Sequence, residues 1–150
     1  FITYWPGTIK PGVSDQMVCT IDLAGSLARH LGVQLPKDAC QDSLDVMDAL
    51  LGKKNAEGRT HLIQQDNGRG GNYGYRVGSW KLQRHDSMKT NNFEVNKLLG
   101  GQRGQKVPRF ALFDLSDDPS EKNNLAEKRP KIFKRMKAEL QKFLDDGRSR

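Results

Sequence analysis

The sequence predicts an α+β fold, in which an antiparallel sheet of about four strands is covered by a long C-terminal helix. Apolar side chains follow helical spacing in the first third of the chain and change to a period of two from residue 60. Gly78-Ser79 has the character of a tight hairpin turn between two such strands. Helical spacing returns after Pro130 and continues to Gly147.

One strand and two helices are expected before the sheet. Phe1–Trp5 is almost entirely apolar or β-favouring, as in a strand buried on both faces. Gly32 is expected to end a first helix, whose apolar residues are Ile21, Leu23, Ala24, Leu27, Ala28 and Leu31. Ser43 is expected to cap a short second helix that ends at Gly52. Because a buried strand needs neighbours, we expect the chain to begin inside a larger protein.

The strands of the sheet are expected at Thr60–Gln65, at Tyr73–Val77, from Trp80 onward, and at Phe110–Leu115. Glycine at the first central position of Gly78-Ser79 supports the mirror-image turn that matches the twist of paired strands. A Gly-rich loop is expected at residues 66–72, and residues 88–108 are expected to be irregular because they are polar and rich in Gly and Lys. These elements predict a sheet of neighbouring antiparallel strands.

The last helix should present an apolar stripe to the sheet. Its members are Ile132, Phe133, Met136, Leu140, Phe143 and Leu144. We assign residues 1–56 to the end of a larger domain, containing the strand and the two helices. Residues 57–150 are assigned to a subdomain formed by the sheet and the long helix.

Composition limits the possible functions. The chain is 35% hydrophobic with a mean hydropathy of -0.74, and it has no apolar run near the roughly 20 residues that cross a bilayer. We therefore expect no membrane span. The net charge of +7 is scattered, and the densest basic stretch, residues 128–142, also carries the apolar stripe of a helix. A solvated helix face explains that stretch, and no nucleic-acid partner is expected.

Metal-binding and catalytic patterns are missing from the sequence. Cys19 and Cys40 do not have the spacing of metal ligands and are expected to be buried free thiols. Turn capping beside Pro119 explains Asp117 and Asp118 without a metal. The sequence by itself therefore predicts no metal site, and we assign no catalytic residue.

Two blocks in the second half of the chain carry a family resemblance. The first is Arg76-Val77-Gly78-Ser79-Trp80-Lys81-Leu82. The second is Leu112-Phe113-Asp114-Leu115 followed by Asp118-Pro119, Glu121 and Asn124-Leu125-Ala126. Tyr4-Trp5-Pro6-Gly7, Asp22-Leu23 and Leu50-Leu51-Gly52 precede them in family order. The chain resembles the C-terminal segment of a type I sulfatase of the arylsulfatase family, in the alkaline phosphatase superfamily.

The resemblance implies a sulfuric ester hydrolase as the parent protein. In that family a formylglycine made from Cys or Ser attacks sulfur, and a divalent cation, usually calcium, binds beside it. The nucleophile motif, Cys or Ser followed by x-Pro-x-Arg, occurs nowhere in these 150 residues. We therefore expect no cofactor in this chain and no activity from it alone. Its expected partner is the N-terminal catalytic part of the same enzyme, and family members tend to be exported.

The resemblance also implies where a substrate could lie. In family members the C-terminal subdomain packs beside the active-site cleft, and loops between its strands can shape the pocket for a sulfated small molecule or glycan. The polar residues that could play this part are His61, Gln64, Gln65, Asp66 and Arg69. An exposed strand end with a solvated loop explains the same residues without a substrate.

Two other functions remain open at this point. A phosphonate or phosphate ester hydrolase of the same superfamily could share this architecture, because fold does not fix the substrate. A free-standing basic module that binds anionic polymers would account for the net charge, although no nucleic-acid-binding motif is present. For the isolated chain we expect self-association, since Phe1–Trp5 would expose an apolar face.

Overall fold

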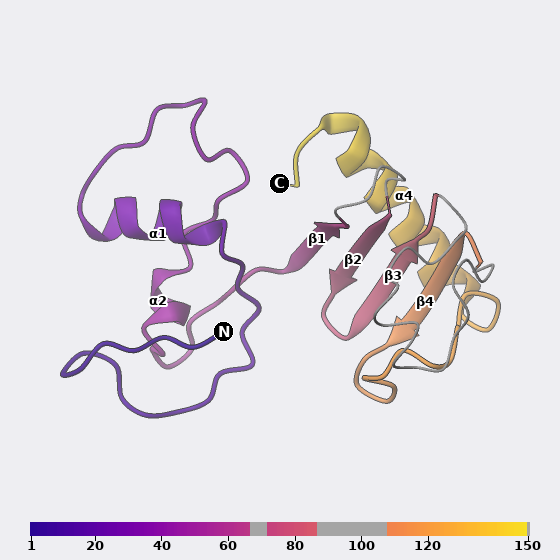
Figure 1. Ribbon diagram of the computed structural model, residues 1–150, viewed down its shortest axis with the longest axis horizontal. Helices are drawn as coiled ribbons and strands as arrows, with labels where there is room; N and C mark the ends of the chain where they lie inside the picture. The colour runs from indigo at the N-terminus through magenta and orange to yellow at the C-terminus, as the bar shows by residue number, and fades with distance from the viewer. Residues whose placement is uncertain (67–71, 87–107, 150) are drawn as a thin grey trace. The chain divides into compact units, whose positions relative to one another are not determined.

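The computed structural model describes residues 1–66, 72–86 and 108–149, which form two compact units (Figure 1). The first unit comprises residues 1–62 and 146–150, and the second comprises residues 63–145. Most of the predicted Gly-rich loop and of the predicted irregular stretch lies outside the described residues. The predicted assignment of residues 1–56 to a larger domain stays a prediction.

The predicted sheet is confirmed. Its strands are β1 (His61–Gln65), β2 (Tyr73–Val77), β3 (Trp80–Arg84) and β4 (Phe110–Asp114), and they lie in the order of the chain as a four-stranded antiparallel sheet. Val77 pairs with Trp80, so Gly78 and Ser79 form the two-residue turn between β2 and β3. Gly78 has φ 57°, the positive value that the predicted turn requires of its first central residue.

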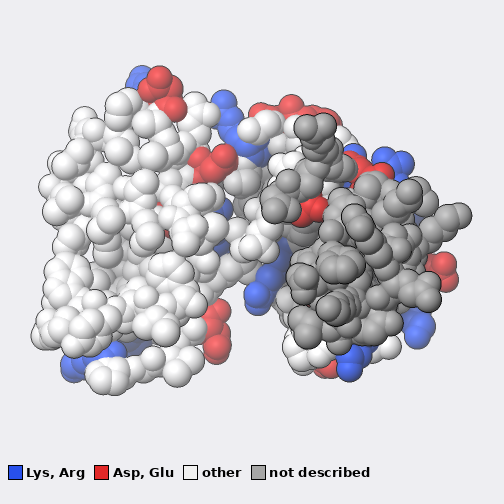
Figure 2. Space-filling view, viewed as in Figure 1, with Lys and Arg blue, Asp and Glu red and all other residues white. Residues whose placement is uncertain are grey.

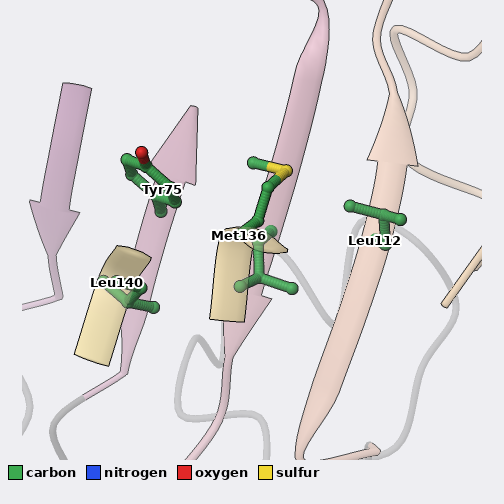
Figure 3. Close-up of a cluster of buried hydrophobic side chains, with 5 residues drawn as sticks. Tyr75, Leu112, Met136 and Leu140 are labelled. Atoms are coloured by element: carbon green, nitrogen blue, oxygen red, sulfur yellow. The ribbon is translucent and has the colours of Figure 1, made fainter. Parts of the chain in front are cut away.

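The core of the second unit lies between this sheet and α4 (Pro130–Asp146). Met136 and Leu140 project from α4 over the strands that carry Tyr75 and Leu112 (Figure 3). Leu82, Leu112 and Met136 are completely buried. The partly buried side chains around them include most of the predicted stripe: Ile132, Phe133, Phe143 and Leu144. The long helix therefore covers the sheet as predicted.

The first unit contains α1 (Asp22–His30) and α2 (Met47–Leu50), and both end at glycine as predicted. Gly32 has φ 68°, and its N–H donates to the Arg29 carbonyl while Val33 N–H donates to the Ala28 carbonyl. This pair of bonds satisfies carbonyls that the end of a helix would otherwise leave unpaired. Gly52, with φ 66°, ends α2 in the same way.

Three predictions for the first unit are wrong. Phe1–Trp5 forms no strand, because no neighbouring strand in the described chain offers it backbone partners. Ser43 does not cap α2, which begins only at Met47; its Oγ instead accepts a hydrogen bond from Gly25 N–H of α1 at 2.8 Å. Cys40 is exposed, whereas we expected a buried thiol.

Replacing Leu112 with Ala should destabilise the second unit by about 2–5 kcal/mol, because it removes a fully buried side chain and leaves a cavity. The measurement is urea denaturation, read as a shift of the midpoint at constant slope. Leu31→Ala is the matched control, since the Leu31 side chain is 71% exposed. Equal midpoints for the two variants would show that Leu112 is not a core residue.

Candidate functional site

The residues predicted to shape a substrate pocket lie along β1. His61 begins the strand and is half-buried, Gln64 and Gln65 are exposed at its end, and Asp66 follows directly. At about 3.3 Å per residue, His61 and Asp66 stand about 16 Å apart along the strand. The structure therefore does not bring these residues to one point. Arg69 lies outside the described residues.

His61 is engaged in holding the C-terminal segment. Its Nε2 lies 2.6 Å from the carbonyl oxygen of Ser149, and its Nδ1 lies 3.2 Å from Thr60 Oγ1. Because a carbonyl can only accept, Nε2 carries the proton. Ser149 in turn donates its N–H and its hydroxyl to Asp42 Oδ1, at 2.6 and 3.0 Å. These contacts explain His61 as a structural residue.

Asp66 is bonded to Asn72 through both backbone and side chain. Its backbone N–H donates to the carbonyl of Asn72 at 3.1 Å, and Asn72 Nδ2 donates to its Oδ2 at 2.7 Å. Gln64 and Gln65, by contrast, are exposed, and within the described chain their side chains are not bonded to another element.

The first unit contains a buried ion pair that the sequence did not reveal. Asp22 is completely buried at the start of α1, and the Arg59 side chain is 1% exposed. Arg59 Nε and NH2 donate to the two Asp22 oxygens, each at 2.7 Å. Such a two-point pair is stronger and more directional than a single contact. The partners are 37 residues apart, and no motif links them.

Backbone groups complete this Asp22–Arg59 network. Asp22 Oδ2 accepts from Cys19 N–H at 3.0 Å, and Oδ1 accepts from Leu44 N–H at 2.9 Å. Arg59 NH2 also donates to the carbonyl of Asp42. Buried Ser26 accepts from Val46 N–H at 2.9 Å. The network therefore joins α1, the segment before α2 and the segment before β1.

The charge of Asp22 is stabilised in place. Burial by itself raises the pKa of the Asp22 carboxyl, but the hydrogen bonds from Arg59, Leu44 and Cys19 outweigh it, so that its pKa lies below the ordinary 3.8. The carboxylate is thus ionised and fully paired. A group held in this way stabilises the fold and is a poor candidate for proton transfer.

A shallow hollow of about 340 Å³ lies between α1 and α2 in the first unit. Arg29 pairs with Asp45 at 2.9 Å, and Lys53 pairs with Asp48 at 2.7 Å. The remaining lining residues are His30, Met47 and Leu51. Since each cation of these pairs has a carboxylate partner, the hollow carries no concentrated positive charge for an anionic substrate.

The two blocks that carry the resemblance meet on the sheet. Lys81 of β3 contacts Glu121 Oε1 at 2.6 Å, and Gln83 donates to the other Glu121 oxygen. Glu121 has φ 55°, a backbone conformation that side chains other than glycine rarely adopt. The contacts with β3 hold Glu121 in this conformation, so the acidic residue of the second block has a structural role.

Asn124 and Leu125 seal the outer edge of β4. Asn124 Oδ1 accepts from Leu112 N–H at 3.0 Å, and Leu125 N–H donates to the Leu112 carbonyl at 2.7 Å. Leu125 also packs against the core, as predicted. The Asn-Leu-Ala segment thus occupies backbone groups through which an open strand edge would pair with another chain.

The described parts of the chain contain no group of three or more His, Cys, Asp and Glu side chains arranged to hold a metal ion. Asp118 is a turn residue: its Oδ2 accepts from Asn123 N–H at 2.7 Å, and backbone hydrogen bonds hold its pKa below the ordinary value. Among the residues described, no helix combines the length and apolar character needed to span a bilayer.

Comparison with known proteins identifies the family. The family model described as N-sulphoglucosamine sulphohydrolase, C-terminal, matches residues 1–148. An N-acetylgalactosamine-6-O-sulfatase of Bacteroides thetaiotaomicron is 32% identical over 150 residues, which are 100% of this chain and 27% of that protein. Arylsulfatase A of Bos taurus is 30% identical over 84% of this chain and 25% of its own length.

Solved structures show the same architecture. One from Bacteroides thetaiotaomicron, described under the metabolism of multiple glycosaminoglycans, superposes with a TM-score of 0.71 at 30% identity, over 92% of this chain and 27% of the other. Another solved protein, described as a complex with its substrate D-glucosamine-2-N,6-O-disulfate, superposes with a TM-score of 0.54 at 20% identity, over 83% of this chain and 24% of the other. This chain spans about a quarter of the length of the curated relatives it matches.

Replacing Asp22 with Asn should destabilise the first unit by about 3–5 kcal/mol, because Arg59 would remain buried without its charge partner. Chemical denaturation measures the change. Asp48→Asn is the matched control: its ion pair with Lys53 is more than half exposed, and such pairs contribute about 0–1 kcal/mol.

The same variant should change the pH dependence of unfolding. Since the folded pKa of Asp22 is below the unfolded value near 3.8, its contribution to stability is complete above that value and is lost as pH falls through the lower folded pKa. Asp22→Asn should therefore flatten the acid limb of the stability curve. An unchanged acid limb would show that the ion pair does not stabilise the folded state.

Proposed function

Because this chain belongs to the family of the N-sulphoglucosamine sulphohydrolase C-terminal region, we propose that it forms the end of an enzyme that hydrolyses sulfate esters. The proposal rests on the match of the family model to residues 1–148. Relatives named as sulfatases are nearly four times as long as this chain and match it over about a quarter of their length. In this proposal the chain supports the fold of the enzyme and lies beside its substrate, and the catalytic groups come from the preceding part.

The surface of residues 1–35 supports a partner of this kind. Within the described residues, every large hydrophobic side chain that is clearly exposed lies in this range: Phe1, Ile2, Tyr4, Trp5, Val13, Ile21, Leu27, Leu31, Val33 and Leu35. Only four charged residues occur there, and one of them, Asp22, is buried. The visible face of the first unit is mostly uncharged (Figure 2). A surface so apolar is typical of an interface.

We propose that this interface receives the N-terminal catalytic part of the same enzyme. Phe1–Trp5 has the composition of a buried strand but no strand beside it in the described chain. In the whole enzyme, the catalytic part would cover the apolar side chains of this segment.

The proposal assigns calcium and formylglycine to that catalytic part. A cation and an activated nucleophile would supply charge stabilisation and attack at sulfur. The described residues contain no group of three or more His, Cys, Asp and Glu side chains arranged to hold a cation, and Arg59, which could otherwise contact a sulfate, is paired with Asp22. The contribution of this chain is therefore structural support and the outer wall of a pocket.

A sulfated saccharide is the substrate class we propose. One relative of this chain is named an N-acetylgalactosamine-6-O-sulfatase, and a protein of similar fold was solved in complex with D-glucosamine-2-N,6-O-disulfate. Gln64 and Gln65 offer uncharged amide groups at the end of β1, and amides hydrogen-bond sugar hydroxyls through both a donor and an acceptor. We propose that the end of β1 and Asp66 contact the sugar, together with Arg69, which lies outside the described residues.

The isolated 150-residue chain should release no sulfate from an aryl sulfate or a sulfated saccharide, whereas the whole polypeptide that contains it should release sulfate from at least one. The isolated chain should also self-associate and bind an apolar dye, because residues 1–35 expose apolar side chains. Sulfate release and light scattering measure the two effects. A monomeric chain that binds no dye would contradict the interface, and a whole polypeptide inactive on every sulfate ester would contradict the function.

In the whole enzyme, Gln64→Ala with Gln65→Ala should lower kcat/KM for the natural sulfated saccharide by about tenfold, through loss of hydrogen bonds to the sugar. Hydrolysis of a small aryl sulfate should change little, because it lacks the sugar. Gln41→Ala, on an exposed loop of the first unit, is the control. Unchanged kcat/KM for both substrates would remove the end of β1 from the pocket.

A further inference from the structure

Cationic side chains gather around the ring of Phe110, at the start of β4. Lys137 Nζ lies 5.0 Å from the centre of this ring, and Arg109 Cζ lies 6.0 Å from it. The ring itself is half-buried and meets Phe133 edge to face, at 5.8 Å between centres. Cations at these distances are attracted by the aromatic face, so Phe110 fixes where the two charges stand.

Arg84 of β3 extends this group of charges. Its Nε pairs with Asp86 Oδ1 at 2.7 Å, its NH1 donates to Gln141 of α4 at 3.2 Å, and its Cζ lies 5.9 Å from the centre of the Tyr73 ring. Only 17% of the Arg84 side chain is exposed. Arg84 is therefore held from three directions. We call Arg84, Arg109, Phe110 and Lys137 the Phe110 cluster.

The Phe110 cluster carries more positive than negative charge. One carboxylate, Asp86, serves two arginines: it lies 2.7 Å from Arg84 and 3.7 Å from Arg109. Gln141 contacts a further acid, Asp145, at 2.8 Å. Among the residues that the structure describes here, these two acids face four cations: the three of the cluster and exposed Lys134, one turn before Lys137 on α4. This excess contrasts with the hollow of the first unit, where two cations meet two acids.

The exposed members are suited to bind sulfate. The Arg109 side chain is 60% exposed, and Lys137 is exposed on α4. Within the described residues, Arg109 pairs with Asp86 only at 3.7 Å, so most of its planar donors are open to a ligand there. A guanidinium can bind two oxygens of one anionic group, while an ammonium acts as a nearby point charge. The aromatic contacts hold both groups in position before a ligand arrives.

We propose that the Phe110 cluster binds the sulfate groups of a sulfated polysaccharide. This inference deepens the proposed function, on which it rests, by naming a polymer as the form in which the substrate reaches the enzyme. A polymer engages several cations at once and releases counterions on binding, so that even a few contacts hold it near the enzyme at low ionic strength. The cluster would then keep the polysaccharide bound between successive cleavages of its sulfate groups.

The test compares two double variants of the whole polypeptide with the same change in net charge. Arg109→Gln with Lys137→Gln removes the exposed cations of the Phe110 cluster, and Lys37→Gln with Lys54→Gln removes two exposed cations of the first unit that lie outside residues 1–35. Binding to a chondroitin sulfate oligosaccharide of defined length is measured at several salt concentrations. The cluster variant should bind about tenfold more weakly and with a smaller salt dependence. The control should bind like the unchanged protein.

A charge-conserving variant separates charge from folding. Arg109→Lys with Lys137→Arg should retain binding, and far-UV circular dichroism should show that all variants are folded. Equal losses in the cluster variant and the control would overturn the proposal, because binding would then follow net charge alone. Equal affinity for a DNA duplex of similar charge, lost in the same variant, would also overturn it in favour of a general polyanion site.

Hydrolysis of a small aryl sulfate, measured in parallel, keeps this inference apart from the proposed function. If the polypeptide hydrolyses the aryl sulfate but the cluster variant binds the oligosaccharide normally, only the cluster proposal fails. If the unchanged polypeptide hydrolyses no sulfate ester but still binds the oligosaccharide through the Phe110 cluster, the proposed function is wrong and the binding site is supported.

Discussion

The side chains of Met136 and Leu140 lie between α4 and the sheet, and the core of the second unit depends on their burial (Figure 3). The helix covers the apolar face of the sheet, which would otherwise be exposed to water. β4 is the last strand in the order of the described sheet, and Asn124 and Leu125 bond to the backbone at its edge. The two family blocks therefore contact each other and stabilise the same sheet.

The first unit is organised differently. Its apolar core is small, formed by Val46, Ala49 and Leu50, and the Asp22–Arg59 network fixes the segments around it. A buried ion pair gains little net free energy over an apolar pair, but it tolerates only one geometry. We infer that this specificity is what the first unit needs, since most of its large apolar side chains face outward.

The proposed interface and the proposed sulfate-binding site lie on different surfaces with different chemical character. Residues 1–35 combine exposed apolar side chains with few charges, which suits a permanent interface. The Phe110 cluster combines exposed cations with an aromatic support, which suits a ligand that binds and leaves. The exposed amides of Gln64 and Gln65 at the end of β1 suit sugar hydroxyls, in keeping with the proposal that this chain contributes the outer wall of a pocket.

The sequence by itself determined the four strands, the hairpin at Gly78, the long helix and the two helix ends at glycine, because each depends on neighbouring residues whose periodicity or backbone freedom is local. It also determined the family, through blocks whose order is preserved. Only the tertiary structure decided that Asp22 meets Arg59, that Ser43 bonds to α1, that Phe1–Trp5 forms no strand, and that cations collect at Phe110. Each of these depends on residues far apart in the chain, and side-chain periodicity carries no information about such long-range pairs.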